Sequence, residues 1–528
     1  AGQRRDVEGA LRALAGHDLA ATAQAAATRQ AEMAVRLHRW LRARESEPPR
    51  TLAQALVRQL DEDAWVDWAI AEVFVGSSDA AVGEAYHRLV TQARERRGEH
   101  DRQFAQLLAE GGVGAGSSGT AGTPSAAGAS DGVAGRATGA ADGVDVLFIE
   151  DVIAHVVAPL AACTPVLLVV VDGMSGAVAA ELVADAERLG WAEFVAGDGR
   201  LPVVAVLPTI TRYSRTSLFC GTLTDGGAAD EKRAFDTLLG ARLFHKDDLR
   251  SSAGYALPEP VRAAMSSGDR VVGVVLNTVD DALAKADPGG TSWTIAGVQH
   301  LRALLDLAAS TGRTVMLTSD HGHVVERGSV RREAAGADAR FRPVAGGTGG
   351  AGGQTRSAGG KTQGAGGLAV QPDEVLLTGH RVLAGGVAVS HGAASAGGNS
   401  RSGGGAGVGG AAVGADRSAG GAIIAAVSED LRYGNKAAGY HGGASAAEVT
   451  VPLVVLSQTV DALTTTGWQP APPQAPPWWF AALPAEYSGS SRNYSAARSY
   501  PTALTDSSGP TDSSGRVDTS SRTHVGAK

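Results

Sequence analysis

The stretch VMLTSDHGHVVE (315–326) joins an apolar run to one carboxylate and two imidazoles. The apolar half is typical of a buried strand, and Asp320, His321 and His323 follow where that strand would end. Asp and Gly are common turn formers, so a simple turn would explain the segment. Asp oxygen and His nitrogen are also ordinary ligands of zinc-like divalent ions. The rest of the chain has to decide between a turn and a metal site.

Further apolar runs indicate that this strand belongs to a sheet. The run PVLLVVVDG (165–173) is short, continuous and β-branched, as expected of a strand buried on both faces. The segment GAVAAELVADAERLG (176–190) reads as a helix that closes with Gly. Other predicted strands are 203–207, 271–276, 314–318, 422–427 and 451–456. With helical segments between several of them, they predict an α/β domain with a mostly parallel sheet flanked by helices.

An α-helical region is predicted before this domain. Residues 1–110 contain long segments rich in Ala, Leu, Arg and Glu, which favour helix. Within them, Trp40, Trp65 and Trp68 are expected to be core residues. At 111–143 the composition changes to Gly, Ala and Ser, which predicts a flexible linker.

The remaining boundaries follow from composition. The α/β domain is placed at 144–484, with disordered Gly-rich insertions near 344–371 and 393–421 and a disordered tail at 485–528. The Pro-rich segment PAPPQAPPWWFAALP (470–484) is expected to lie extended along the domain surface.

Charge and cysteine content exclude several classes of protein. A net charge of -8 over 528 residues argues against a general nucleic-acid coat, although a local basic groove stays open. Two cysteines form no disulfide framework, so a cytoplasmic protein is expected. We find no apolar run of about 18 residues and no signal peptide, and so expect no membrane span. Because residue 1 is Ala rather than Met, it stays open whether the chain is a piece of a longer protein.

Polar side chains follow strand after strand. Asp172 follows the first strand, PTITRYSR (208–215) the second, NTVDD (277–281) the third and SDHGH (319–323) the fourth, while GYHGGAS (439–445) precedes the last. In open α/β sheets, ligands bind at the carboxyl ends of the strands. Chance would scatter such residues among helices, loops and strand starts, so the sequence predicts a functional site at this edge of the sheet.

Phosphoryl or sulfuryl transfer at a divalent metal fits these residues. Asp172, Asp320 and His321 would give oxygen, oxygen and nitrogen ligation with an open position. A Thr hydroxyl in that position would be a usable nucleophile. A second ion nearby would stabilise the leaving oxygen.

Four motifs together resemble the PglZ domain of the alkaline phosphatase superfamily, as found in type-2 BREX phage-defence systems. They are the Asp-Gly after the first strand, LPTITRYSRTSLF (207–219), TSDHG (318–322) and GYHGGAS with the strand after it. The resemblance spans 165–456. It implies an alkaline-phosphatase-like fold, a metal-dependent phosphohydrolase, and other BREX proteins as partners. It also implies a phosphate-ester substrate, with nucleic acid or a nucleotide among the candidates.

The resemblance also implies a role for each matching residue. Asp172, Asp320 and His321 would hold a first divalent ion, zinc as the first choice and manganese as the alternative. Thr211 would be the nucleophile, with Thr209 as the alternative, and Arg215 or Arg212 would clamp a phosphate oxygen. His441 would bind a second ion together with Asp280 or Asp281. The set of candidate site residues is Thr211, Thr209, Arg215, Asp172, Asp320, His321, Asp280, Asp281, His441 and His323.

One departure from the family pattern bears on the second ion. The superfamily usually has a His four residues after the Asp of the NTVDD segment, and those positions are Ala284 and Lys285 here. The number of bound ions, one or two, therefore stays open. His323 could replace the missing His as a ligand, or it could lie outside the ligand shell. A sulfatase would need a Cys or Ser that is converted to formylglycine, and PTITRYSR lacks that Cys. A phosphomutase would use a Ser nucleophile and a full set of ligands for two metals, which the Ala and Lys at 284 and 285 disfavour. A non-catalytic scaffold with a structural or vestigial metal site is the remaining alternative.

Overall fold

The computed structural model describes residues 7–44, 47–110, 146–197, 199–250, 256–285, 292–344, 370–384, 420–459, 463 and 467–480. The predicted linker (111–143), the predicted tail (485–528) and nearly all of the two predicted Gly-rich insertions lie outside these residues. The domain boundaries given above therefore stay predictions. Among the described helices, none combines the length and the apolar character needed to cross a membrane.

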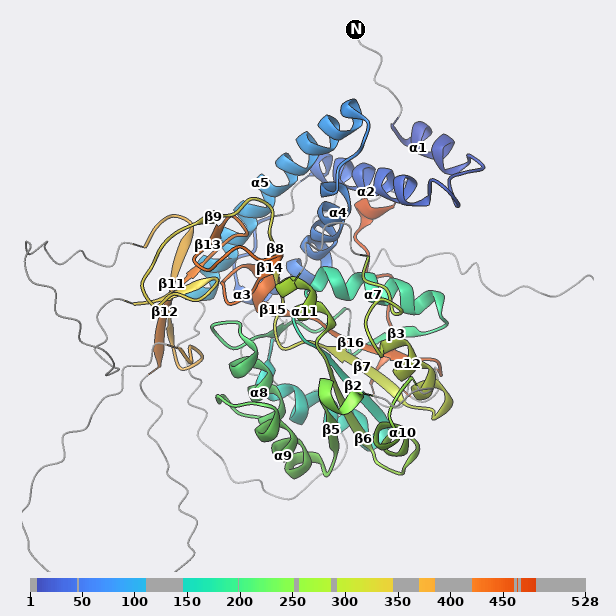
Figure 1. The fold of residues 1–528 in the computed structure, drawn as a ribbon, viewed down its shortest axis with the longest axis vertical. Helices are drawn as coiled ribbons and strands as arrows, with labels where there is room; N and C mark the ends of the chain where they lie inside the picture. The colour runs from blue at the N-terminus through green and yellow to red at the C-terminus, as the bar shows by residue number, and fades with distance from the viewer. Residues whose placement is uncertain are drawn as a thin grey trace, which may run out of the picture. The chain divides into compact units, whose positions relative to one another are not determined.

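Helices fill the N-terminal region, as predicted, and strands begin only after it (Figure 1). These helices are α1 (Val7–Ala15), α2 (Ala25–Arg42), α3 (Leu52–Arg58), α4 (Ala64–Phe74) and α5 (Ala80–Glu110). A π-helical segment, Gln59–Asp63, joins α3 to α4. Trp40 and Trp65 are buried in the core of this region and Trp68 packs against it, which confirms their predicted role.

A seven-stranded sheet forms the centre of the α/β part. Its strands, in spatial order, are β17 (Gln469–Pro470), β3 (Ala192–Val195), β16 (Leu453–Ser457), β7 (Thr314–Thr318), β2 (Val166–Val171), β6 (Val271–Leu276) and β5 (Arg242–Phe244). Strands β7, β2, β6 and β5 are parallel neighbours, whereas β16, β3 and β17 pair antiparallel. The α/β prediction is confirmed, and the parallel arrangement is confined to the half of the sheet that contains β2.

Helices cover both faces of this sheet, which explains the continuous apolar sequence of β2. Leu167 and Val169 pack on one face with α7, α10, α11 and α12, while Leu168 and Val170 pack on the other with α6, α8 and α9. The helices are α6 (Ala158–Cys163), α7 (Gly176–Arg188), α8 (Thr211–Cys220), α9 (Ala228–Leu239), α10 (Glu259–Ser266), α11 (Thr278–Lys285) and α12 (Leu301–Ser310).

Small sheets form outside the central sheet, and three of the predicted strands differ from the prediction in their length, their sheet or their continuity. The run 203–207 contributes only β4 (Val203–Val204), and 422–427 becomes β12 (Gly421–Ala426) of a separate antiparallel sheet. Pro452, which lacks a backbone N–H, divides 451–456 between β15 (Thr450–Val451) and β16. The other described strands are β1 (Leu147–Phe148), β8 (Val324–Val325), β9 (Val330–Arg331), β10 (Phe341–Pro343), β11 (Glu374–Gly379), β13 (Leu431–Arg432) and β14 (Gly439–Tyr440). The other described helical segments are α13 (Ala446–Val449) and the short turns Ile149–Asp151, Ile153–Val157 and Lys246–Leu249.

The Pro-rich segment docks on the N-terminal helices. Trp478 and Trp479 lie in a 3₁₀ turn (Pro477–Trp479) and are both buried. The Trp479 ring lies 4.9 Å from the ring of Trp65, and the Arg36 guanidinium lies 4.2 Å from its centroid. Residues more than 400 positions apart in the chain thus share one aromatic core, where an extended surface strip was expected.

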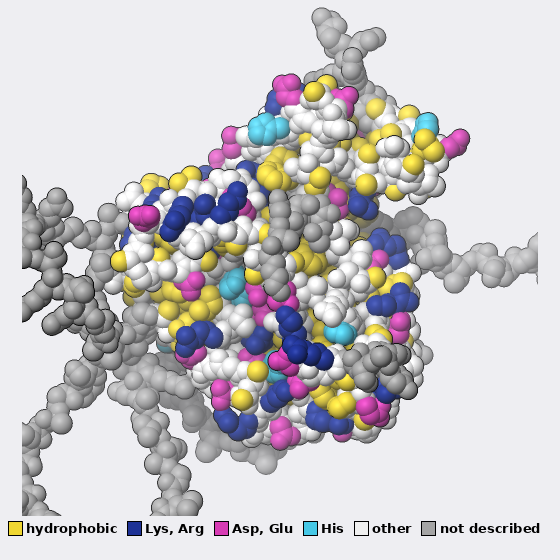
Figure 2. All heavy atoms as spheres, viewed as in Figure 1, with side chains coloured by type: hydrophobic (Ala, Val, Ile, Leu, Met, Phe, Trp, Pro, Cys, Tyr) yellow, Lys and Arg dark blue, Asp and Glu magenta, His cyan; other side chains and the backbone are white. Residues whose placement is uncertain are grey.

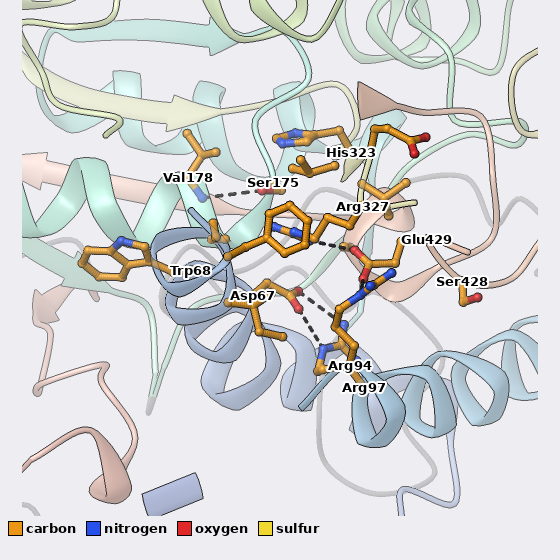
Figure 3. Close-up of a pocket in the computed structure, with 18 of the residues that line it drawn as sticks. Asp67, Trp68, Arg94, Arg97, Ser175, Val178, His323, Arg327, Ser428 and Glu429 are labelled. Atoms are coloured by element: carbon orange, nitrogen blue, oxygen red, sulfur yellow. Dashed lines mark hydrogen bonds and ion pairs between the residues drawn. The ribbon is translucent and has the colours of Figure 1, made fainter. Parts of the chain in front are cut away.

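Charged side chains lie where α4 and α5 pack against the loops of the α/β part, and a cavity of about 90 Å³ lies between them. Within the helices, Arg97 donates to Asp67 at 2.9 Å. Arg94 of α5 pairs with Glu429 of the α/β part (Figure 3). Ser175 and His323 line the same cavity. The N-terminal helices therefore pack directly behind the loops that follow β2 and β7.

Charges of both signs are mixed over the face drawn in Figure 2, where Lys and Arg side chains form small groups with Asp and Glu among them. Many of the basic residues are held in ion pairs, such as Arg212 with Asp225 and Arg242 with Asp269. This mixture agrees with the net charge of -8.

Candidate metal centre

The loops after β2 and β7 bring Asp172, Asp320 and His321 together. Because β2 and β7 are parallel neighbours, their carboxyl ends meet at one edge of the sheet. One ligand atom from each of the three side chains lies within 4.8 Å of the others. All three residues are buried. The juxtaposition predicted from the strand ends is present.

Backbone geometry and one hydroxyl fix the two loops. Gly173 has a φ of 76°, a conformation that favours Gly, and its N–H donates to Asp320 Oδ1 at 3.2 Å. The Ser319 hydroxyl accepts from the Met174 N–H at 2.9 Å and donates to the carbonyl oxygen of Val171 at 2.8 Å. A Cβ on Gly322 would lie 1.9 Å from the Ala447 carbonyl oxygen, so only Gly fits there. The Asp-Gly and His-Gly pairs therefore serve both the turn and the site.

The donor set fits a divalent cation. Asp320 Oδ2 is buried and has no hydrogen-bond partner among the described residues. Burial raises the pKa of Asp320, and burial together with the charge of Asp320 raises the pKa of Asp172 to about 6. Two buried carboxylates with an orphaned oxygen are costly unless a cation compensates them. A divalent ion would supply that compensation.

The imidazole of His321 is poised as a neutral ligand. Burial and the neighbouring His441 lower its pKa to about 4. Nδ1 lies 3.0 Å from the Gly322 carbonyl oxygen, which accepts from an Nδ1–H. The lone pair is then on Nε2, 3.5 Å from Asp320 Oδ2. Such a backbone contact commonly sets the tautomer of a metal-binding His.

The raised pKa of Asp172 predicts a pH dependence of metal affinity. An ion must displace the Asp172 proton below about pH 6, and the raised pKa of the ligand Asp320 means that its proton must be displaced as well, so the apparent affinity for Zn²⁺ should fall by at least about tenfold per pH unit as the pH drops below 6. His321 adds no further proton until about pH 4, because its own pKa is lowered. Calorimetric Zn²⁺ titrations between about pH 5 and 8 measure this. A flat profile through pH 6 would show that Asp172 is not a ligand.

The structure separates the two candidate nucleophiles. Thr211 is the first residue of α8, and its hydroxyl donates to Asp172 Oδ1 at 3.3 Å and lies 3.2 Å from His321 Nε2. The hydroxyl of Thr209 instead donates to the Gly443 carbonyl at 3.3 Å and accepts from the Gly442 N–H at 2.9 Å. Thr211 thus lies in the acidic cluster, and Thr209 holds the loop that carries His441.

A second, less complete group lies beside the first. The rings of His321 and His441 stack with centroids 4.4 Å apart, and His441 Nε2 lies 3.6 Å from Asp280 Oδ1. Burial and the charge of Asp172 raise the pKa of Asp280. Ala284 lies one turn further along α11 and offers no ligand atom. Asp280 and His441 are therefore brought together as predicted, without a third side chain at position 284.

Two of the predicted ligands point elsewhere. Asp281 pairs with Lys246, outside the buried cluster. The His323 Nδ1 lies 2.6 Å from the Gly173 carbonyl, and the side chain faces the cavity that Ser175 lines (Figure 3). His323 therefore contacts the backbone of the Asp172–Gly173 turn from the side of that cavity.

Residues 152–341 match the family model described as "BREX system PglZ alkaline phosphatase-like domain". This segment is a PglZ domain. The matched range contains Asp172, Thr211, Asp320 and His321, and ends before His441.

Among solved structures, two similar ones are distant. Phosphonoacetate hydrolase from Sinorhizobium meliloti 1021, solved with phosphonoacetate, is 14% identical over 56% of this chain and 90% of its own, with a TM-score of 0.31. Murine ectonucleotide pyrophosphatase/phosphodiesterase 5 is 11% identical over 55% and 87%, with a TM-score of 0.30. No curated protein matches the chain. The assignment of residues 152–341 to the PglZ domain rests on the family model alone.

Arg215 of the PglZ domain is engaged by carboxylates. Its Nη1 lies 2.6 Å from Asp172 Oδ2, and its Nε donates to Glu231 at 3.2 Å. The Asn277 amide donates to the same Asp172 oxygen at 2.7 Å. The other candidate clamp, Arg212, is largely exposed and pairs with Asp225.

Sequence reasoning included Asn277 and Ser319 in the polar segments at the strand ends but gave them no role, and it missed Glu231. Asn277 directly follows β6 and Ser319 directly follows β7, so their place at the strand ends was the signal that could have singled them out. Glu231 lies on α9, far from any strand end. No sequence signal points to it.

Proposed function

We propose that this protein, which contains a PglZ domain, is a metal-dependent phosphohydrolase, a phosphodiesterase or phosphatase, that acts in a BREX-type bacteriophage-resistance system. The observation that carries the proposal is the Thr211 hydroxyl, which donates to Asp172 and contacts His321 inside a buried Asp/Asp/His cluster. The family description supports a phosphatase-like role in BREX. Assembly with other BREX proteins and action in the cytoplasm are parts of the same proposal.

The cluster suits attack on a phosphate ester. The Thr211 hydroxyl would lose its proton along its hydrogen bond to Asp172 Oδ1, and its oxygen would form a bond to phosphorus as the bond to the leaving oxygen breaks. The leaving oxygen would take up a proton from solvent, and water would later release the phosphate from Thr211. The hydrogen bond to Asp172 Oδ1 holds the hydroxyl proton away from the face that attacks. A divalent ion bound by Asp172, Asp320 and His321 would neutralise the charge that develops on phosphate.

Zinc is the proposed metal, with manganese as the alternative, because two carboxylate oxygens and one imidazole nitrogen suit both. One ion is proposed for the natural protein. The second group offers Asp280 and His441, and position 284 is Ala.

A substitution tests the number of ions. Ala284→His places an imidazole one helical turn after Asp280, on the same side of α11, and should raise the bound zinc from one to two ions per chain. Metal analysis after dialysis against Zn²⁺ measures the ratio. Ala282→His is the matched control, because residues two apart on a helix do not share a face. An unchanged ratio of one in both variants would contradict a second subsite at Asp280 and His441.

A scaffold with a vestigial metal site is the second candidate function. The observation that favours it is the same Ala at position 284, which leaves the second group incomplete. A scaffold would bind metal or partners without turnover.

Hydrolysis of bis-p-nitrophenyl phosphate and p-nitrophenyl phosphate separates the two candidates. The protein is stripped with a chelator, and Zn²⁺ or Mn²⁺ is then titrated back. Metal-restored turnover supports the hydrolase, and the preferred ester distinguishes a diesterase from a monoesterase. Metal binding without turnover on either ester favours the scaffold.

A further inference from the structure

Glu231 is a buried carboxylate on α9 that lies outside the cluster of candidate ligands. Its two oxygens accept from Arg215 Nε at 3.2 Å each, and one of them lies 2.6 Å from His245 Nε2. The Thr216 hydroxyl also donates to it at 3.2 Å. The residue is 0% exposed. Four contacts around a fully buried carboxylate hold it in one place.

Through Arg215, this carboxylate reaches the candidate metal centre. Arg215 Nη1 lies 2.6 Å from Asp172 Oδ2, and the Asn277 amide donates to that oxygen at 2.7 Å. Asp172 Oδ2 is thus held by two donors. Asp172 Oδ1 instead faces Thr211 and His321, at 3.3 Å and 3.8 Å. The two carboxylate oxygens of Asp172 therefore have different partners.

We propose that Glu231 is a positioning residue of the metal centre: it fixes Arg215, which ties down Asp172 Oδ2 so that Oδ1 alone is presented to a divalent ion. Glu231 touches neither the ion site nor the substrate site and acts through Arg215. The inference deepens the proposed function and rests on its metal centre.

Charge balance gives a second reason for Glu231. Arg215 is 11% exposed and stays charged, because Asp172, Asp320 and Glu231 raise its pKa although burial lowers it. Without Glu231, a full positive charge would stand beside Asp172 and Asp320 and repel the ion. With Glu231, which stays ionised because His245 and Arg215 outweigh the effect of burial on its pKa, that charge is balanced. Outer partners of metal ligands typically change metal affinity by about 10- to 100-fold when they are replaced.

The test is the substitution Glu231→Gln, which keeps the shape of the side chain and removes its charge. Zn²⁺ affinity of the stripped full chain is measured by titration calorimetry, and thermal unfolding is recorded alongside. We expect affinity to fall about tenfold or more. The matched control is Glu193→Gln: Glu193 also forms a buried bidentate pair, with Arg200 at 2.7 and 2.9 Å. The control should lose comparable stability and keep its Zn²⁺ affinity.

A double-mutant cycle with Arg215→Gln tests whether Glu231 acts through Arg215. If it does, Glu231→Gln adds little to the loss of Zn²⁺ affinity already caused by Arg215→Gln. Additive losses would overturn this route. Should Arg215→Gln fail to fold, the comparison of Glu231→Gln with Glu193→Gln still decides the proposal.

The possible results separate this inference from the proposed function. Equal Zn²⁺ affinity in Glu231→Gln and wild type overturns the positioning role and leaves the hydrolase proposal standing. Weakened affinity in a protein that hydrolyses no ester supports the positioning role and removes the hydrolase. A wild-type chain that binds no divalent ion overturns both.

Discussion

Thr211→Ala should abolish turnover of phosphate esters while Zn²⁺ binding persists. Among the described residues, Thr211 is the only Thr or Ser whose hydroxyl donates to Asp172. The proposed reaction begins at that hydroxyl oxygen. Loss of a nucleophile typically lowers kcat by on the order of 10³-fold or more, with residual rate from the rest of the site. The three proposed ligands stay in place, so the affinity for Zn²⁺ should change little. Steady-state kinetics on both nitrophenyl esters and calorimetry on the same preparation measure the two quantities.

Thr211→Ser is the matched control for the role of the hydroxyl. Ser keeps the oxygen at the first position of α8, and we expect kcat within about tenfold of wild type. Full activity of Thr211→Ala would mean that a different nucleophile attacks phosphorus. Equal inactivity of the Ala and Ser variants would mean that the methyl group, and so the packing of Thr211, matters more than its oxygen.

Asp320→Asn should weaken metal binding strongly and, in the metal-free protein, raise the melting temperature. Asp320 is 0% exposed and its Oδ2 lacks a hydrogen-bond partner, so an ionised Asp320 depends on a cation. Asn carries no charge and is a poor ligand, and we expect Zn²⁺ affinity to fall by at least about 100-fold together with turnover. Calorimetry with Zn²⁺ and thermal unfolding after chelation measure the two effects.

The sign of the stability change follows from the raised pKa of Asp320. Burial makes the folded chain hold this proton to a higher pH than the unfolded chain does. The resulting cost to folding is absent below the unfolded pKa and grows as pH rises through the folded one, so the advantage of Asn in the metal-free protein should grow with pH. Asp281→Asn is the control, since Asp281 pairs with Lys246 outside the cluster, and it should leave Zn²⁺ affinity unchanged. A metal-free Asp320→Asn protein that is less stable than wild type at pH 8 would contradict this account.

The sequence by itself determined the edge of the sheet at which the candidate site lies. Apolar runs such as 166–171 must be buried on both faces, and neighbouring parallel strands align their carboxyl ends. Asp172 directly follows one such strand and the Asp320–His321 pair begins two residues after another, so local sequence places them at the same edge, and the pairing of β2 with β7 brings them together. The helical N-terminal region was equally readable, because helix propensity acts within a few residues.

Only the tertiary structure decided which neighbours share in the site. Thr209 and Thr211 have the same chemistry two positions apart, and the start of α8 directs Thr211 to Asp172 while Thr209 binds the loop after β14. His323 and Asp281 match ligands in type, yet one faces the cavity behind the loop and the other pairs with Lys246.

No local sequence pattern predicts the contacts between residues that are far apart in the chain. Glu231 reaches Asp172 through Arg215, and Trp479 enters the aromatic core of the N-terminal helices from more than 400 residues away. Strand periodicity and helix propensity report only near neighbours along the chain. The partners of a buried charge or ring depend on how whole elements pack, and that is fixed only when the chain has folded.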